Sequence, residues 1–193
     1  LLAIVMAGDQ DITTDIVVPT NYSGNSVVDR NFFTFTGMHS VVNCDYTQAF
    51  TATKASLTNF LALDGQSVSC TFLQFPVGAI NPLHTHSRSA ELLLLLRGWL
   101  NVGFIDTNNK LYKQTLRAGD IFVFPKGLVH HQPNDDAKHP CATLSAFGSA
   151  NAATVSVPLN VLTSGIDDNI IDRAFITDVV TVQKLRASRT PKS

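Results

Sequence analysis

The sequence predicts an all-β domain, a barrel or sandwich of antiparallel strands, followed by a short helical extension. Three observations predict this fold class. From about residue 27 to 157 the chain consists of short runs rich in β-branched and aromatic residues. Gly, Pro, Asn and Asp interrupt these runs at intervals of roughly ten residues, as turns between strands do. After Pro158 the apolar residues recur at helical spacing instead.

The strand-like runs account for most of this region. They are NFFTFTGMHSVV, VSCTFLQFPVG, ELLLLLRGWLNVGFID, LYKQTLRAGDIFVFPKG and ATLSAFGSANAATVSV. The segment DTNNK between two of them is typical of a hairpin turn. The five leucines at 92–96 lie between Glu91 and Gly98 and are too few for an independent helix. We therefore expect a strand that is covered on both faces.

The helical tail is expected over residues 159–188. Its apolar positions are Ile170, Ile171, Ala174 and Phe175, then Val179, Val182 and Leu185. Thr177 or Asp178 can cap the second of these helices. No linker or internal repeat separates the parts, so residues 8–193 are expected to form one domain, with the barrel at about 27–157.

The charge content and hydropathy of the sequence indicate which kinds of binding partner to expect. Charged residues make up 15% of the 193 residues, against about a quarter in typical domains. A surface this poor in charge predicts a homo-oligomer. The net charge of -1 and the absence of a basic stripe argue against nucleic acid as a partner. No apolar run approaches the roughly 20 residues that span a bilayer, so we expect no membrane insertion.

The first residues are expected to be the remnant of a secretory signal. Residues 1–6 are apolar, and Val5 and Ala7 are small enough for the positions before a cleavage site. An ordinary first strand is the alternative for residues 1–7. Asn21 begins the glycosylation sequon Asn-Tyr-Ser, which is compatible with a secreted, extracellular protein.

The three cysteines, Cys44, Cys70 and Cys141, are odd in number and form no close pair. This spacing excludes a disulfide scaffold and a zinc knuckle. It leaves open at most one bridge within the chain, or free thiols.

Residues 81–98, NPLHTHSRSAELLLLLRG, contain the first candidate ligands. On a strand, residues two apart point to the same face, so His84 and His86 present their imidazoles side by side. The polar SRSA is suited to a turn, which places Glu91 at the start of the neighbouring strand. On its own, a His-x-His pair is common and does not establish a metal site.

A second cluster, GDIFVFPKGLVHHQPN at 119–134, strengthens the metal hypothesis because it supplies His130 at the start of a later strand. Three imidazoles and one carboxylate give four ligands to an ion that prefers six, which leaves two positions for water or substrate. Alternation puts Gln132 on the same face as His130, where it can line the cavity. His131 points to the opposite face and is not expected to be a ligand.

The two segments resemble the two cupin motifs as germins carry them. The matching positions are Gly78, His84, His86, Glu91 and Gly98 in the first segment, and Gly119, Pro125, Gly127, His130 and Asn134 in the second. The resemblance extends over nearly the whole chain and is to the plant germin-like proteins. It implies a cupin jelly-roll β-barrel and a manganese ion held by the three histidines and the glutamate. It also implies secretion to the cell wall and hexamers built as a trimer of dimers.

The resemblance implies superoxide dismutase activity, with oxalate oxidase as the alternative; Asn81 matches an asparagine that lines the oxalate oxidase site. A divalent ion with these ligands keeps a local charge of about +1, which favours a small anionic substrate. A non-catalytic ligand-binding or cell-wall protein is the third reading. The chain departs from the usual germin pattern at Ser87, His131 and Pro133, and it lacks the two N-terminal cysteines of germins.

Overall fold

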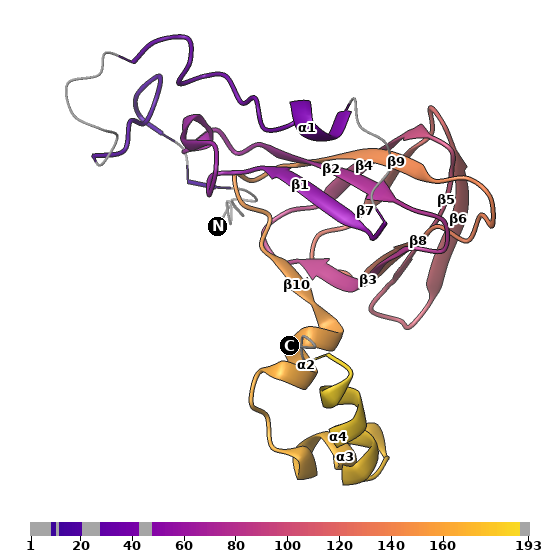
Figure 1. Cartoon of the computed structure of the whole chain (residues 1–193). Coiled ribbons are helices and arrows are strands. Elements are labelled where there is room, and N and C mark those ends of the chain that lie inside the picture. The colour runs from indigo at the N-terminus through magenta and orange to yellow at the C-terminus, as the bar shows by residue number, and fades with distance from the viewer. Residues whose placement is uncertain (1–8, 11, 21–27, 43–47, 190–193) are drawn as a thin grey trace.

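The computed structural model describes residues 9–10, 12–20, 28–42 and 48–189. Two five-stranded antiparallel sheets face each other (Figure 1). The first has the order β1 (Thr51–Ala55), β2 (Ser69–Phe75), β9 (Cys141–Phe147), β4 (Glu91–Arg97) and β7 (Ile121–Phe124). The second has the order β10 (Thr154–Ser156), β3 (Ile80–His86), β8 (His130–Pro133), β5 (Trp99–Ile105) and β6 (Leu111–Arg117). The all-β fold class is thereby confirmed.

The hydrophobic core fills one end of the space between the sheets. It is formed by Leu73, Phe75, Leu93, Leu95, Leu100, Val102, Leu116, Phe124 and Cys141. Along β4, Glu91, Leu93 and Leu95 point inward and are nearly inaccessible to solvent. Glu91 begins the strand, so the polar end of the interior lies next to the apolar core.

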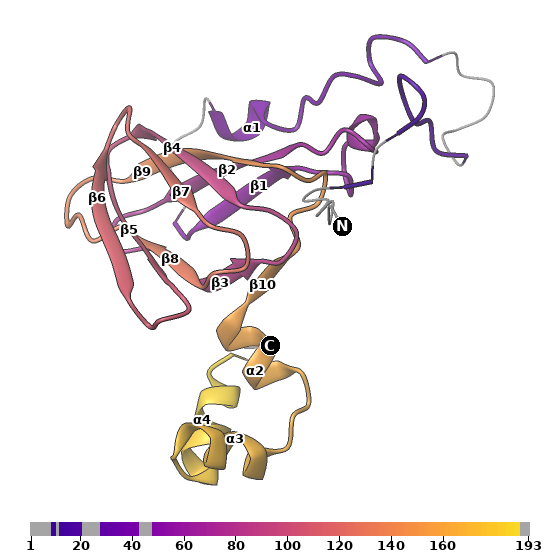
Figure 2. The same cartoon turned by 180° about the vertical axis from the view of Figure 1, so that it is seen from behind.

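The leucine run forms β4, as its flanking residues predict, but only one of its faces is covered. Leu92 is 46% exposed and Leu96 is 45% exposed in the single chain. Figure 2 shows β4 beside β7, the edge strand of the first sheet. The expectation of a strand buried on both faces is therefore wrong for the isolated chain, because the outward side chains of Leu92 and Leu96 stay about half exposed.

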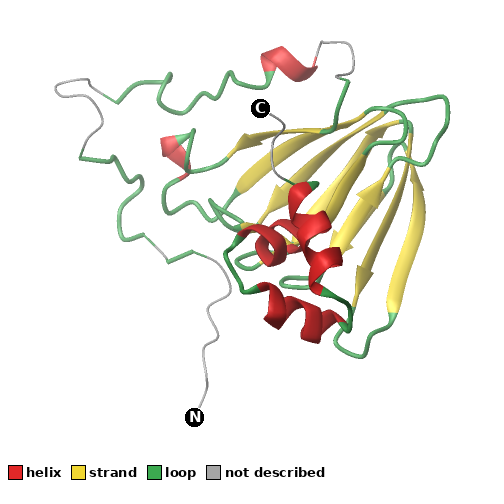
Figure 3. Cartoon of the chain, turned by 60° about the horizontal axis from the view of Figure 1, so that its bottom comes forward, coloured by secondary structure: helices red, strands yellow, loops and turns green. Residues whose placement is uncertain are grey.

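Three helices follow the last strand: α2 (Val157–Thr163), α3 (Asp168–Phe175) and α4 (Val179–Ala187). α2 packs against β3 and β10, and α3 packs against α4 (Figure 3). Asp167 caps α3 through the backbone N–H of Asn169, and Asp178 caps α4 through that of Thr181. The pair α3–α4 projects away from the sheets (Figure 1).

The segment before β1 differs from the strand-like pattern of its sequence. Its described part contains turns and the one-turn helix α1 (His39–Val42), and a short 3₁₀ helix (Leu61–Leu63) follows β1. The N–H of Phe32 bonds to the carbonyl of Asp29, which closes a turn instead of a strand ladder. The aromatic residues that suggested a strand pack by their rings: Phe35 stacks on Phe60.

Several expectations from the sequence concern residues that the structure does not describe. Residues 1–7, Asn21 and Cys44 lie outside the described residues, so the signal remnant and the glycosylation site stay predictions. Of the described cysteines, Cys70 and Cys141 are both free thiols. Within the described ranges, no helix is long and apolar enough to cross a bilayer.

Candidate metal centre

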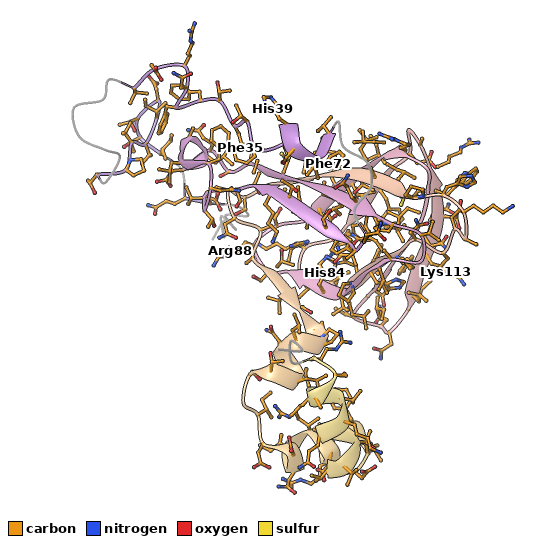
Figure 4. The ribbon with its side chains drawn as sticks, viewed as in Figure 1. Phe35, His39, Phe72, His84, Arg88 and Lys113 are labelled. Atoms are coloured by element: carbon orange, nitrogen blue, oxygen red, sulfur yellow. The ribbon has the colours of Figure 1, made fainter. Side chains whose placement is uncertain are left out.

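The pairing of β3 with β8 brings three histidines together. His84 and His86 both point inward from β3 and are 3% and 5% exposed. Antiparallel pairing places His130 of β8 directly opposite His84, with ring centroids 4.1 Å apart. Figure 4 shows His84 between the two sheets. Two neighbouring strands of one sheet thus supply all three imidazoles.

The carboxylate comes from the opposite sheet. The turn after β3 is held by Ser89, whose hydroxyl accepts a bond from the N–H of Gly148, and Glu91 follows as the first residue of β4. Glu91 Oε2 lies 3.2 Å from Nε2 of His86 and 3.2 Å from Nε2 of His130. One ligand atom from each of the four residues lies within 4.8 Å of the other three, and all four side chains are buried.

Backbone carbonyls orient two of the rings for metal binding. His84 Nδ1 lies 2.7 Å from the carbonyl oxygen of Pro82, and His130 Nδ1 lies 2.8 Å from that of Leu128. A carbonyl can only accept, so each Nδ1 carries the hydrogen, and the lone pair of the neutral ring is on Nε2. These nitrogens face the centre of the cluster. Such bonds to the second ring nitrogen are typical of histidines that bind metal.

Two further side chains orient Glu91. The Ser145 hydroxyl donates to Glu91 Oε1 at 2.6 Å, and the Gln132 amide donates to the same oxygen at 3.4 Å. Asn81 in turn donates to the Gln132 side-chain oxygen at 2.6 Å. Oε1 is therefore occupied by hydrogen bonds, while Oε2 faces the histidines. Gln132 is fully buried next to Glu91, and it does not line the cavity as alternation suggested.

The electrostatics favour the protonation states that a metal ion requires. Burial raises the pKa of Glu91, but contacts with His130, His86 and Ser145 outweigh it and lower the value to about 2. Burial, together with repulsion from His130, lowers the pKa of His84 to about 4. At neutral pH the cluster thus offers a carboxylate and, at His84, an uncharged imidazole. Metal ligands have to be deprotonated in this way.

A cavity of about 310 Å³ opens onto the cluster. Its lining is formed by Phe50, Ala52, Lys54, Ser56, Thr58, Ser69, Thr71, Leu73, Asn81, His84, His86, Glu91, Ser145, Phe147 and residues 151–154. Asn81 lines this cavity beside the histidines, where the family resemblance places it. The site is therefore open on one side, as a catalytic metal site requires and a closed structural site does not.

The positions where the chain departs from germins lie away from this cavity. His131 and Pro133 line a groove on the outer face of the second sheet. There a Cβ on Gly103 would lie 3.0 Å from His131 Nε2, so a larger residue at this position would require the His131 ring to shift. Ser87 does not line the cavity either. None of these three side chains lines the cavity over the cluster.

Three residues of the site had no signal in the sequence: Lys54, Ser145 and Thr154. Ser145 and Thr154 lie on strands that pair with β4 and β3, and Lys54 lies on β1, which pairs with β2. Alternation alone predicts that Ser145 points inward, but not that it meets Glu91, 54 residues earlier.

Comparison with known proteins agrees with this architecture. Residues 43–183 match the cupin family. The chain is 51% identical to germin-like protein 9-3 of rice (Oryza sativa subsp. japonica) over 98% of this chain and 90% of that protein. It is 43% identical to germin-like protein 9-1 of the same plant over 100% of this chain and 79% of that protein.

Solved structures of oxalate oxidase have the same fold. One of them is in complex with the substrate analogue glycolate, and both superpose with a TM-score of 0.78 at 25% identity, covering 100% of this chain and 98% of theirs. Three findings point to the same family. The two sheets face each other, the histidines and the glutamate of the two motifs meet at one buried point, and the identity to the rice relatives extends over nearly the whole chain. The chain belongs to the germin-like proteins of the cupin family.

Proposed function

We propose that this chain is a secreted, manganese-binding oxidoreductase with superoxide dismutase activity. The observation that carries the proposal is the meeting of His84, His86, Glu91 and His130 around one point on the wall of an open cavity. Three neutral imidazoles and one carboxylate leave a divalent ion with two free positions and a local charge of about +1.

The donor set fits manganese and excludes purely soft ions. Imidazole and carboxylate ligands suit manganese, iron and zinc, but dismutation needs an ion that changes its oxidation state, which zinc does not. The family resemblance selects manganese among the redox-active candidates. The backbone bonds of Pro82 and Leu128 present two imidazole lone pairs, and Ser145 leaves the second carboxylate oxygen available.

Dismutation converts two superoxide ions and two protons into dioxygen and hydrogen peroxide. A bound manganese ion supplies the one-electron exchange that links the two halves of this reaction. The protein holds the ligands rigidly through buried hydrogen bonds and gives superoxide access through the cavity. The electrostatic environment of the loaded site attracts a small anion.

The test is the dismutase activity of the purified, manganese-loaded protein. We expect activity above that of free manganese, and its loss together with the bound metal in His130→Ala. His131→Ala is the matched control, because the neighbouring ring lies in the outer groove and should leave both properties intact. A manganese-loaded protein without activity above free manganese would refute the proposal.

Oxalate oxidation is the second candidate, and Asn81 on the cavity wall favours it. Oxalate and dioxygen with two protons give two molecules of carbon dioxide and one of hydrogen peroxide. Asn81 has an amide that can reach a carboxylate near the cluster, and it is held by Gln132. Oxalate-dependent peroxide release, absent in His86→Ala, would establish this reaction. A loaded protein that is inert in both assays would instead be a ligand-binding protein.

We further propose that the protein is a homo-oligomer, a hexamer built as a trimer of dimers. The outer face of the first sheet exposes the apolar side chains of Leu92, Leu96, Ile121 and Val123. A second apolar surface lies on the helical tail, where Phe175 and Val180 are more than half exposed. Contiguous apolar patches of this kind mark protein interfaces, and two separate patches allow two kinds of contact between copies.

Secretion to the apoplast or cell wall is the remaining part of the proposal. It rests on the apolar residues 1–6 and on the sequon at Asn21. When the gene is expressed in plant cells, we expect the protein in apoplastic fluid, with a mass that falls after glycosidase treatment. Retention inside the cells would contradict this localisation.

A further inference from the structure

The cavity over the metal cluster contains one cationic side chain, Lys54 of β1. Among the described residues that line the cavity, no other lysine or arginine occurs. β1 and β10 form the corresponding edges of the two sheets (Figure 1). Lys54 thus lines the cavity from an edge strand. The side chain is exposed.

Strand register connects Lys54 to the cluster. Lys54 pairs with Thr71 on β2, and Thr71 pairs with Ser145 on β9. All three line the cavity, and Ser145 bonds to Glu91. A row of polar side chains therefore crosses the inner face of the first sheet, from the cavity opening to the carboxylate of the cluster.

The Lys54 ammonium is also close to the histidines of the second sheet. Its Nζ lies 3.4 Å from the Thr154 hydroxyl, and that hydroxyl lies 3.4 Å from His86 Nδ1. A lysine ammonium has three donors, and no carboxylate of the described residues forms an ion pair with this one. Its charge is therefore available to a ligand that reaches the cluster.

The size of the cavity exceeds what superoxide needs. A volume of about 310 Å³ lies at the lower end of the range for organic ligands, about 300–1,000 Å³. Its apolar wall includes Phe50, Leu73 and Phe147, which can contact a short carbon chain. A ligand with an anionic group at each end would satisfy both the cluster and Lys54.

We propose that Lys54 is a specificity-determining residue that pairs with the distal carboxylate of a small organic di-acid, whose other carboxylate faces the three histidines and Glu91. This inference rests on metal binding at the proposed site but not on dismutase activity. No bond is made or broken in the step; the ammonium and the carboxylate form a charge-assisted hydrogen bond. A monocarboxylate lacks the second group and gains nothing from Lys54.

The experiment compares ligand affinities of the manganese-loaded protein by isothermal titration calorimetry at about 0.15 M salt, where the Debye length is about 8 Å. The probes are oxalate, malonate and succinate, with acetate as the monocarboxylate. In Lys54→Met we expect the tightest-bound di-acid to lose about 10-fold in affinity, and acetate to change less than about 2-fold. Lys54→Arg should retain most of the di-acid affinity because it keeps the charge.

Lys113→Met is the control. Lys113 projects from β6 into the outer groove, away from His84 (Figure 4), so its loss should not change any affinity. Equal di-acid affinities in the wild type and Lys54→Met would overturn the inference, and so would di-acids that bind no better than acetate. Dismutase activity is measured on the same samples. Di-acid binding that depends on Lys54 without dismutation would refute the proposed activity and leave this inference intact.

Discussion

The hydroxyl of Ser145 donates a 2.6 Å hydrogen bond to Oε1 of Glu91 in the buried interior between the two sheets. The bond joins β9 to the first residue of β4 and fixes the rotation of the only carboxylate in the cluster. Partners of this kind tune metal affinity although they do not touch the ion.

Ser145→Ala should weaken manganese binding by about 10-fold while the fold is retained. The remaining contact of Oε1, with Gln132 at 3.4 Å, is too long to replace the lost bond. Affinity is measured by competition with a chelator. Thr143→Val is the matched control, because Thr143 points inward from the same strand but its hydroxyl has no partner in the described structure. Equal losses in both variants would show that Ser145 has no special role.

The contrast between His130 and Ser145 shows what the sequence can predict. His130 was identifiable because it belongs to a motif with turn residues at fixed positions and because histidine is a ligand type. Ser145 belongs to a strand of small residues with no chemical signature, and it meets Glu91 only through the register of β4 with β9. The register of distant strands depends on packing of the whole interior, which local patterns do not encode.

Local sequence patterns predicted one part of the fold correctly and two parts wrongly. The helical tail was predictable from its spacing, and Asp178 was one of two expected caps. The segment around Phe32 was expected to be extended because it is rich in aromatic residues, but its backbone closes turns. The outward leucines of β4 were expected to be covered, and a single chain cannot show which surface covers them.

The stability of the metal-free protein should fall as the pH drops from 6.5 to about 4. In this window the unfolded chain binds a proton at His84 that the folded chain excludes, because burial and His130 lower the pKa of His84 to about 4. The loss from this residue is on the order of 3 kcal/mol at most. Urea unfolding of chelator-treated protein measures it, and His84→Gln should show a weaker pH dependence. Identical profiles in both proteins would contradict the assignment.

Cys141 should resist thiol reagents in the folded protein. It is inaccessible in the core, and burial, with a smaller effect from Asp136, raises the pKa of its thiol to about 12. At pH 8 its reactive thiolate is therefore scarce. Alkylation followed by peptide mass spectrometry should leave Cys141 unmodified in the native protein and modify it in urea. Rapid native labelling of Cys141 would contradict the buried position.

A charge on the outer face of the first sheet should disrupt the proposed oligomer. Leu92 lies opposite Val123 and both are about half exposed in the single chain. Leu92→Lys should lower the molecular mass in sedimentation velocity, since an unpaired charge is costly in an apolar interface. Thr107→Lys, in the exposed turn between β5 and β6, adds the same charge and should leave the mass unchanged. If Leu92→Lys sediments as the wild type does, this face is not an interface.

The most direct test of the central claim is the position of the ion itself. Crystals of the manganese-loaded protein, measured at the manganese absorption edge, should show one anomalous peak per chain between the two sheets. The account predicts that this peak lies within bonding distance of Nε2 of His84, His86 and His130 and of the Glu91 carboxylate. An ion bound elsewhere, or a loaded protein in which one of these four side chains points away from it, would contradict the account.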